Sequence, residues 1–405
     1  MRFLRTASTR RLLTVIVGAI VVIAAGGAIA IAAAGSGPVA QPASLADAAH
    51  RAAAAPAPAG ITAEISFTNN LIDSSDFTGQ ATDPILQGAT GRLWLTGNHL
   101  RLELQSDDGD AQVLVDGRSF WVSDPTSHTV YEGMLPADST QHAGAGHQVP
   151  SVAQIQALLA MLAQRMNISG AQPTDVAGQP AYRVSVSPRH DGGLLGQLQL
   201  AWDADRGVPL EFGIYARNNT TPVLDLKATD ISYGAVAESV FAISPPSGDQ
   251  VVQLATAGHA TPGHATPGHS ARMPRGRHAQ LSGVGPVAAA VPFKLNAKPS
   301  LVGLPRRGVR VLDMGDRKAA LITYGQGLGG LAIIEQAAAA SSRPSGGTVD
   351  GLNLPTVSIN GATGQELSTA LGTVLRFTSG KVAYTLIQSG PAQAAEAAAR
   401  ALTGS

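Results

Sequence analysis

The sequence contains no cysteine among its 405 residues. Disulfide bonds, thiol catalysis, zinc–thiolate sites and iron–sulfur clusters are therefore excluded. Attachment of a lipid to an N-terminal cysteine is excluded as well. The absence does not identify the compartment, because an exported protein can simply lack disulfides.

Charge is also scarce, since only 14% of the residues are charged and 28 basic residues balance 28 acidic ones. Capture of nucleic acid depends on a basic surface, so the composition predicts no nucleic-acid partner. The hydrophobic share of 44% is enough for a sizeable core. With 46 glycines and 25 prolines, the chain is expected to make many turns, which favours β structure over a helical bundle. The length suggests two domains.

Motifs that indicate catalysis are missing. The sequence has no G-x-S-x-G elbow, no phosphate-binding G-x-x-x-x-G-K-[ST] loop and no H-E-x-x-H helix. Gly325–Gly330 matches G-x-G-x-x-G, but an apparent returning strand, Leu331–Glu335, follows it, so the segment is interpreted as a hairpin turn. We therefore expect a protein that is not an enzyme and that needs no cofactor.

Two segments resemble metal sites superficially. Asp107–Asp110 lacks the spaced ligands of a calcium loop and is interpreted as an acidic turn. The tandem repeat with His259, His264 and His269 could offer imidazole ligands, but its five-residue spacing matches no usual zinc motif. A solvated linker is the favoured interpretation, and no metal ion is expected.

The N-terminus indicates export. An uncharged run of 23 residues, Leu12–Ala34, follows four arginines: Arg2, Arg5, Arg10 and Arg11. As a helix this run would be about 35 Å long, which exceeds the roughly 30 Å of a membrane's hydrocarbon core. The arginines would stay in the cytoplasm, leaving the folded domains outside. A signal peptide cleaved near Ala32 or Ala34 is the alternative, and it would give a secreted protein.

Composition and periodicity divide the rest of the chain. The expected plan is a signal anchor at 1–34, a tether with a short helix near Leu45–Ala55 at 35–60, a first domain at 61–252, a linker rich in Pro, Gly and His at 253–295, and a small α+β domain at 296–405. The second domain is expected to end in a helix that begins at Pro391.

The first domain alternates like a series of half-buried strands. Leu100, Leu102 and Leu104 are separated by Arg101 and Glu103, which is a period of two. Turn signals such as Gly97-Asn98 and Asp116-Gly117 separate consecutive runs, so an antiparallel meander is predicted.

One helix is predicted to interrupt this meander. Apolar residues recur at a helical spacing after Pro150, and Ser151 with Gln154 fits a capping box. The helix is expected to end at Gly170. Its apolar positions are Ile155, Leu158, Leu159, Leu162 and Met166.

Five segments in this order resemble the LolA-like superfamily of lipoprotein carriers and the related N-terminal domains of RseB and MucB. Ser123 stands where the family's usual hairpin has a tyrosine, and the resemblance spans about Leu45 to Val252. It implies an unclosed, strongly curved antiparallel β half-barrel with helices plugging its concave side, followed by a small α+β domain. The segments are Gly91–Glu103, Asp116–Pro125, Leu198–Leu210, Ala228–Tyr233 and Phe241–Gly248.

The resemblance also implies a function, namely binding or carrying a lipid, lipoprotein or other lipophilic ligand whose acyl chains occupy an apolar cavity. Arg101 falls where the family places an arginine that holds the lid helices, although a solvated arginine paired with an acid is the simpler interpretation. The candidate lipid-binding residues, which a plain packed core would explain equally well, are Leu100, Leu102, Leu104, Val113, Val115, Trp121, Leu158, Leu162, Leu198, Leu200, Trp202, Leu210 and Phe212.

Two other functions are left open. A regulatory sensor of envelope stress would bind a lipid signal and a membrane-protein partner such as an anti-sigma factor. A structural envelope protein would have a filled core and no ligand.

Overall fold

The computed structural model describes residues 37–72, 88–106, 109–125, 128–135, 149–189, 193–254, 281–314, 317–338 and 354–404. The predicted anchor and the histidine repeat lie outside these residues, as does part of the turn at Asp107–Asp110. Within the described ranges, no helix combines the length and the apolar character needed to span a membrane. The chain divides into two compact units, the first of which reaches Ala255.

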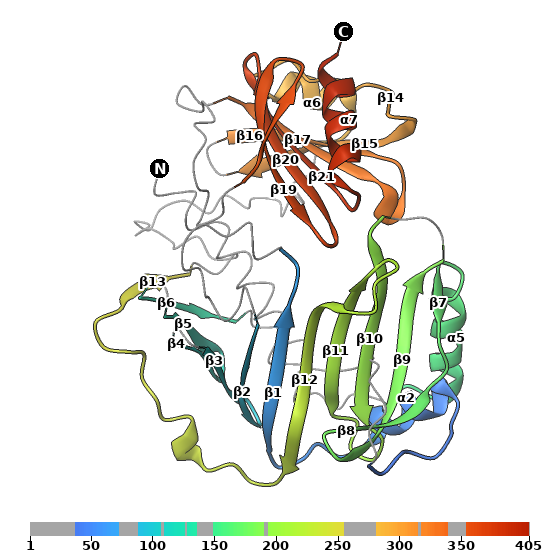
Figure 1. Cartoon of the computed structure of the whole chain (residues 1–405), viewed down its shortest axis with the longest axis vertical. Helices are drawn as coiled ribbons and strands as arrows, with labels where there is room; N and C mark the ends of the chain where they lie inside the picture. Colours follow the sequence, from blue (N-terminus) through green and yellow to red (C-terminus); the bar gives the residue numbers. More distant parts are fainter. Residues whose placement is uncertain are drawn as a thin grey trace, which may run out of the picture. The chain divides into compact units, whose positions relative to one another are not determined.

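The first unit is built on a curved 13-stranded sheet (Figure 1) in the order β13-β6-β5-β4-β3-β2-β1-β12-β11-β10-β9-β7, with β8 paired to β9. All neighbouring strands are antiparallel except β13 and β6. The predicted meander and the antiparallel half-barrel class are therefore confirmed. The strands are β1 Ile61–Asn69, β2 Gly88–Thr96, β3 His99–Ser106, β4 Gly109–Asp116, β5 Ser119–Asp124, β6 Thr129–Met134, β7 Met166–Ile168, β8 Gln172–Val176, β9 Gln179–Pro188, β10 Leu195–Asp203, β11 Pro209–Ala216, β12 Pro222–Tyr233 and β13 Gln250–Gln253.

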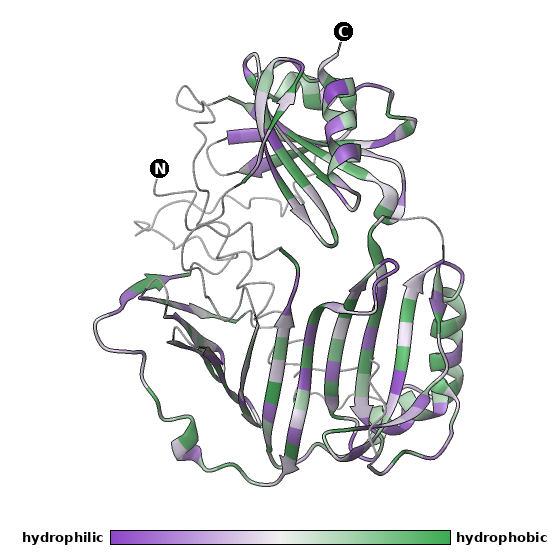
Figure 2. Ribbon diagram, in the orientation of Figure 1, coloured by the Kyte–Doolittle hydropathy of each residue, from purple (hydrophilic) through white to green (hydrophobic). Residues whose placement is uncertain are grey.

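Hydrophobic and hydrophilic residues alternate along these strands (Figure 2), because successive side chains point to opposite faces. A β-bulge between Glu64 and Ile65 in the β1–β12 pairing keeps this alternation in phase. Ile231 and Leu226 lie five residues apart in β12, so in a regular strand they would point to opposite faces, whereas the bulge lets them pair with Ala63 and Phe67 on one face of β1. The alternating stretches Val223–Lys227 and Ile231–Tyr233, which by periodicity alone predict two strands, form the single strand β12.

Two helices accompany this sheet, and both were predicted. Helix α2 spans Leu45–Ala54 and is capped by the Ser44 hydroxyl, which accepts a hydrogen bond from the Asp47 backbone. Helix α5 spans Val152–Leu162 and begins with the predicted capping box of Ser151 and Gln154. Its predicted end at Gly170 is wrong, because the chain turns after Leu162 and continues as strand β7. Pairing of Met166–Ile168 with β9 satisfies backbone groups that a longer helix would have used internally.

The second unit has an 8-stranded antiparallel sheet in the order β14-β15-β16-β17-β21-β20-β19-β18. The glycine-rich segment forms the predicted hairpin turn between β16 and β17, with η3 at Gly327–Gly329. The predicted C-terminal helix is α7, Ala392–Thr403, with Pro391 as its N-cap. The strands are β14 Ser300–Leu301, β15 Leu304–Met314, β16 Arg317–Tyr324, β17 Leu331–Ala337, β18 Thr356–Ile359, β19 Ala362–Thr369, β20 Gly372–Ser379 and β21 Val382–Gln388.

Helices close one face of this second sheet. Helix α6 spans Val284–Ala290, and its Val287 is buried together with Ala398 and Leu402 of α7 against strand residues such as Ile333. The predicted linker, 253–295, therefore contains part of a folded core. Its apolar run was too short to be recognised beside so many glycines and prolines.

A carboxyl group is buried in the second unit's core. The Glu335 side chain is fully buried in β17, and its Oε2 accepts a hydrogen bond of 2.9 Å from the Asn296 backbone. Burial raises the pKa of Glu335 to about 7, and this effect outweighs the lowering by the Asn296 hydrogen bond. The group therefore titrates near neutral pH in the folded protein.

The first prediction concerns this carboxyl. Because the folded pKa lies above the value of 4.5 for a free glutamate, the folded state keeps a proton that the unfolded state releases. The free energy of unfolding of the second unit should therefore fall as the pH rises from about 4.5 to about 7. Glu335→Gln should weaken this dependence, as measured by calorimetry at several pH values; Glu366, whose pKa burial also raises, would retain a part of it.

All three tryptophans lie in the first unit. Unfolding of the second unit can therefore be recognised as the calorimetric transition that is not accompanied by a change in tryptophan fluorescence. Asp313→Asn, at an exposed site, is the control and should keep the slope. An unchanged slope in Glu335→Gln would contradict the assignment.

Candidate functional site

One face of the first sheet is apolar from strand to strand, and we call it the apolar face. Paired residues on neighbouring strands share a face, so registers identify its members. Two rows define it. The first is Val184–Leu200–Phe212–Leu226–Phe67–Ala89, and the second is Leu93–Leu102–Val113–Val122–Tyr131. The rows are joined because Ala89 and Leu93 point the same way from β2.

Most predicted lining residues lie on this face in one hydrophobic cluster. Leu198 belongs to the face through its pairing with Ile214 and is half-buried, as is Phe212. The cluster contains no residue of a described helix. The predicted residues that are buried in it are Leu100, Leu102, Leu104, Val113, Val115, Leu200 and Leu210.

Helix α2 covers the β9–β10 end of the apolar face. Trp202 and Tyr182 are buried there against Leu45 and Ala48. Arg51 donates a hydrogen bond of 2.9 Å to the Tyr182 hydroxyl, which itself donates to the Gln41 carbonyl at 2.6 Å. Trp202 thus packs against α2, and its predicted contact with a ligand would require α2 to move.

The turn between β10 and β11 supports the same helix. Gly207 has a positive φ of 69°, and a Cβ there would lie 2.4 Å from the Ala52 carbonyl oxygen of α2. Only glycine combines this positive φ with the absence of a Cβ that would clash with α2.

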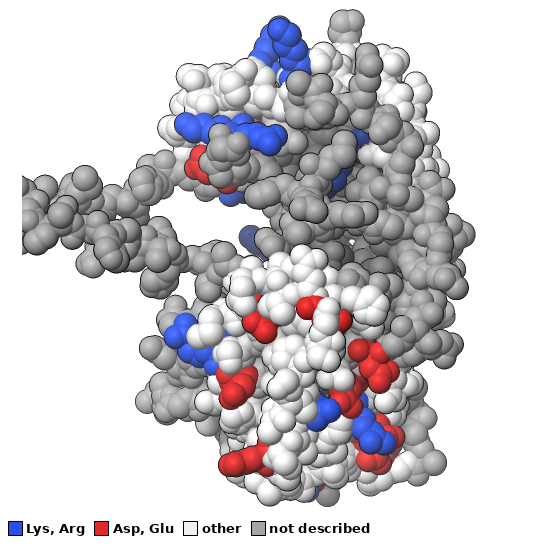
Figure 3. Space-filling model, turned by 90° about the vertical axis from the view of Figure 1, so that its left-hand side faces the viewer, with Lys and Arg blue, Asp and Glu red and all other residues white. Residues whose placement is uncertain are grey.

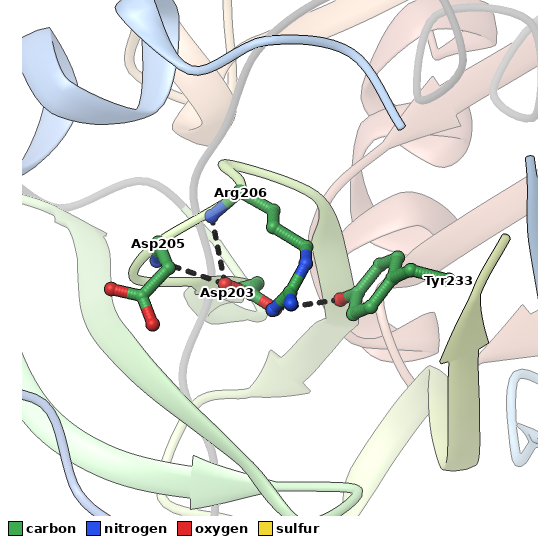
Figure 4. A network of polar contacts seen from close by, with 4 residues as sticks. All are labelled: Asp203, Asp205, Arg206 and Tyr233. Atoms are coloured by element: carbon green, nitrogen blue, oxygen red, sulfur yellow. Dashed lines mark hydrogen bonds and ion pairs between the residues drawn. The ribbon is translucent and has the colours of Figure 1, made fainter. Parts of the chain in front are cut away.

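A buried carboxylate fixes this turn (Figure 4). The Asp203 side chain accepts backbone hydrogen bonds of 2.8 Å each from Asp205 and Arg206, and the Tyr233 hydroxyl donates to it at 2.7 Å. The Arg206 guanidinium lies 4.3 Å from the centre of the Tyr233 ring. Burial, followed by the hydrogen bond to Asp203, raises the pKa of Tyr233 above its usual range. Sequence analysis missed this network, although Asp203-Ala-Asp-Arg-Gly207 is a recognisable turn signal.

Trp121 and Arg101 lie on the opposite face of the sheet. Trp121 pairs with Leu114, and both are buried with Phe241 in a separate cluster. The expectation that Trp121 lines the same cavity as Leu102 is therefore corrected, because neighbouring positions in a strand alternate.

Arg101 fastens the segment that covers this opposite face. Its Nη1 donates a hydrogen bond of 2.7 Å to the carbonyl of Val240, which belongs to η2, Glu238–Val240. The guanidinium also forms an ion pair with Glu103 and lies 5.2 Å from the ring centre of Trp94. These bonds go to η2 and not to α2 or α5, so Arg101 lies on the wrong face to latch either described helix.

The two predicted residues of α5 point outward. Leu158 is 51% exposed and Leu162 is 43% exposed, and no residue of α5 is buried. The other side of the helix borders a cleft of about 350 Å³, which is near the lower end of ligand-site volumes. Its lining residues are Leu45, Leu159, Ala160, Ala163, Ile168, Ser169 and Gly170.

A polar row crosses the face opposite to the apolar one in strands β9–β12. Arg183 and Glu211 are both buried, and Glu211 pairs with Lys227 across β11 and β12. Burial raises the pKa of Glu211 to about 7, and burial likewise raises that of Asp225 to about 6. Sequence analysis missed this row, because charged residues at alternate strand positions are normally expected in solvent.

Among the described residues, no group of three or more His, Asp or Glu side chains could hold a metal ion. The features of the first unit that could receive a ligand are its apolar sheet face and the cleft beside α5.

Comparisons with known proteins give only remote likenesses. No family model matches the chain, and no curated protein matches it. The MucA/MucB complex of Pseudomonas aeruginosa contains a chain with 18% identity, a coverage of 88% of this chain and 97% of that one, and a TM-score of 0.41. A LolA superfamily protein from Nitrosomonas europaea has 8% identity, 50% and 99% coverage, and a TM-score of 0.21. MucB and the LolA superfamily are also the proteins that the sequence motifs resemble. Identities and TM-scores this low say nothing of a ligand or a partner of this chain.

The second prediction concerns the turn that seats α2. Tyr233→Phe removes one donor from the buried Asp203 carboxylate, so the free energy of unfolding of the first unit should fall by about 1–3 kcal/mol. Urea unfolding followed by tryptophan fluorescence measures the change. Ser232→Ala, at the exposed neighbouring position, should alter stability by less than about 0.5 kcal/mol. Equal effects of the two substitutions would show that the hydroxyl bond is unimportant.

Proposed function

We propose that this protein binds a lipid or another lipophilic molecule on the apolar face of its first unit, outside the cytoplasmic membrane. The observation that carries the proposal is the contrast between the two sheets. Helices α6 and α7 supply buried residues to the core of the second unit, whereas no described helix contributes to the large apolar cluster of the first. An apolar face of this size must be kept from water, and an acyl chain would do so.

Part of the face is accessible enough to receive such a ligand. Leu198, Phe212 and Leu226 are half-buried, whereas Leu100 and Leu102 are each only 5% exposed. A ligand would therefore be expected to enter over β10–β12. Each CH₂ group transferred from water would contribute about 0.8 kcal/mol.

Membrane attachment is part of the proposal. The arginine-flanked apolar run, Leu12–Ala34, supports a single-pass anchor with both units outside the cytoplasm. An anchored protein can hand a lipid on at its own membrane or respond to it, but it cannot travel. A sensor that binds a membrane-protein partner is consequently the alternative outcome of the tests below.

The third prediction is that residues 38–405 retain lipid when they are purified without detergent. Native mass spectrometry should detect the adduct, and extraction should identify it. Leu198→Glu and Phe212→Glu should each lower occupancy severalfold, because a charge on the face opposes burial of an acyl chain.

Val251→Glu is the matched control, since Val251 is 51% exposed on β13 and should tolerate the charge. Circular dichroism would verify that all variants are folded. A clean apo mass with no uptake of added lipids would overturn the lipid-binding proposal. A protein partner that cross-links in cells and dissociates on adding lipid would favour the sensor.

The fourth prediction tests the anchor. The full chain should stay in the membrane fraction after a carbonate wash, and residues 38–405 should be released. Mass spectrometry of the mature N-terminus separates an uncleaved anchor from a signal peptide removed near Ala34. Recovery of the uncleaved full chain in the soluble fraction would contradict membrane attachment.

A further inference from the structure

Helix α5 exposes an apolar stripe. Leu158, Met161 and Leu162 are 51%, 59% and 43% exposed, and they recur at i, i+3 and i+4 on one side of the helix. Leu159, Ala160 and Ala163 occupy the other side, next to the cleft. Water-exposed side chains of this size on adjacent positions are unfavourable and mark interaction sites.

Basic groups lie at the C-terminal end of this stripe. Arg165 lies in the turn that follows the helix, and its carbonyl accepts a hydrogen bond of 3.0 Å from the Arg189 backbone. Both side chains are exposed. The sequence from Val149 to Gly170 contains no Asp or Glu, and the neighbouring α2 contributes only Asp47 and Arg51 as charged groups.

This charge pattern differs from that of another side of the first unit. On the side seen in Figure 3, acidic side chains lie among uncharged and basic ones. The segment around α5 has arginines beside exposed leucines and no Asp or Glu, a combination that favours contact with an anionic surface.

The chain itself keeps α5 close to the proposed anchor. Ten residues lie between Ala34 and Leu45, so the eleven residue steps from one to the other can span at most about 40 Å. Helix α2 begins at Leu45 and packs against α5, where the His50 ring donates a hydrogen bond of 2.8 Å to the Pro150 carbonyl. A helix tied this closely to a membrane-spanning segment meets the lipid surface at a high local concentration.

We propose that α5 is a membrane-contact helix that inserts Leu158, Met161 and Leu162 into the interface of an anionic phospholipid bilayer, with Arg165 and Arg189 at the lipid phosphates. The stripe is separate from the apolar face of the sheet, so this contact does not require a lipid bound there. It would hold the first unit against the membrane from which a ligand comes.

The absence of cysteine allows a direct test, because any introduced cysteine is unique. The full chain carrying Met161→Cys, labelled with an environment-sensitive fluorophore, is reconstituted into phosphatidylcholine vesicles with and without phosphatidylglycerol. We expect a blue-shifted, stronger emission with the anionic vesicles, quenched by spin-labelled lipid and weakened by salt. Val251→Cys, which is similarly exposed, is the control and should give no such change.

Two sets of variants test the stripe and its cations separately. In the Met161→Cys background, Leu158→Gln with Leu162→Gln should reduce the quenchable fraction about tenfold, since both apolar anchors are lost. Arg165→Gln with Arg189→Gln should abolish the preference for phosphatidylglycerol. Met134→Gln with Val251→Gln, both at exposed sites, should change neither quantity.

Three outcomes would overturn the proposal: equal signals at positions 161 and 251, an undiminished signal in the Leu158/Leu162 variant, or a signal that rises with protein concentration in the absence of vesicles. The last would assign the stripe to contact between two copies of the chain. Lipid retained by residues 38–405 should be unaffected by the α5 variants, so failure here is distinguishable from failure of the lipid-binding proposal.

Discussion

The requirement to keep one continuous apolar sheet face from water governs the first unit. Cross-strand register aligns the apolar residues of β1–β6 with those of β9–β12, and the bulge in the β1–β12 pairing keeps the two sets on one face. Curvature of the sheet then gathers these side chains into one cluster (Figure 1). Among the described residues, the cluster is formed by strands and by the turns that connect them, and no described helix contributes to it.

The elements around this face have distinct tasks. Helix α2 is held over its β9–β10 end by Arg51, Tyr182 and the glycine of the β10–β11 turn. On the opposite face, Arg101 binds the η2 segment over Trp121 and Leu114. Both contacts stabilise the sheet, and of the two only α2 covers a part of the apolar face, at Val184 and Trp202. The second unit shows the contrasting solution, since α6 and α7 close its sheet with buried alanines, valines and a leucine.

Helix α5 contributes no buried residue to the core of either unit. It borders a cleft on one side and leaves its larger apolar residues in water on the other. A lipid surface would satisfy this stripe, and the short connection from the apolar N-terminal run to α2 would bring it there.

The sequence alone determined the local structure. Alternation predicted most strands, and the Ser151–Gln154 capping box located the start of α5, because these signals depend on residues a few positions apart. It could not decide which face each strand turns inward, so Trp121 and Leu102 were grouped together although they point oppositely. Nor could it reveal that Leu158 and Leu162 face water, or that Glu335 is buried. Burial and facing depend on register and on contacts between segments distant in the sequence, which exist only once the sheet has formed.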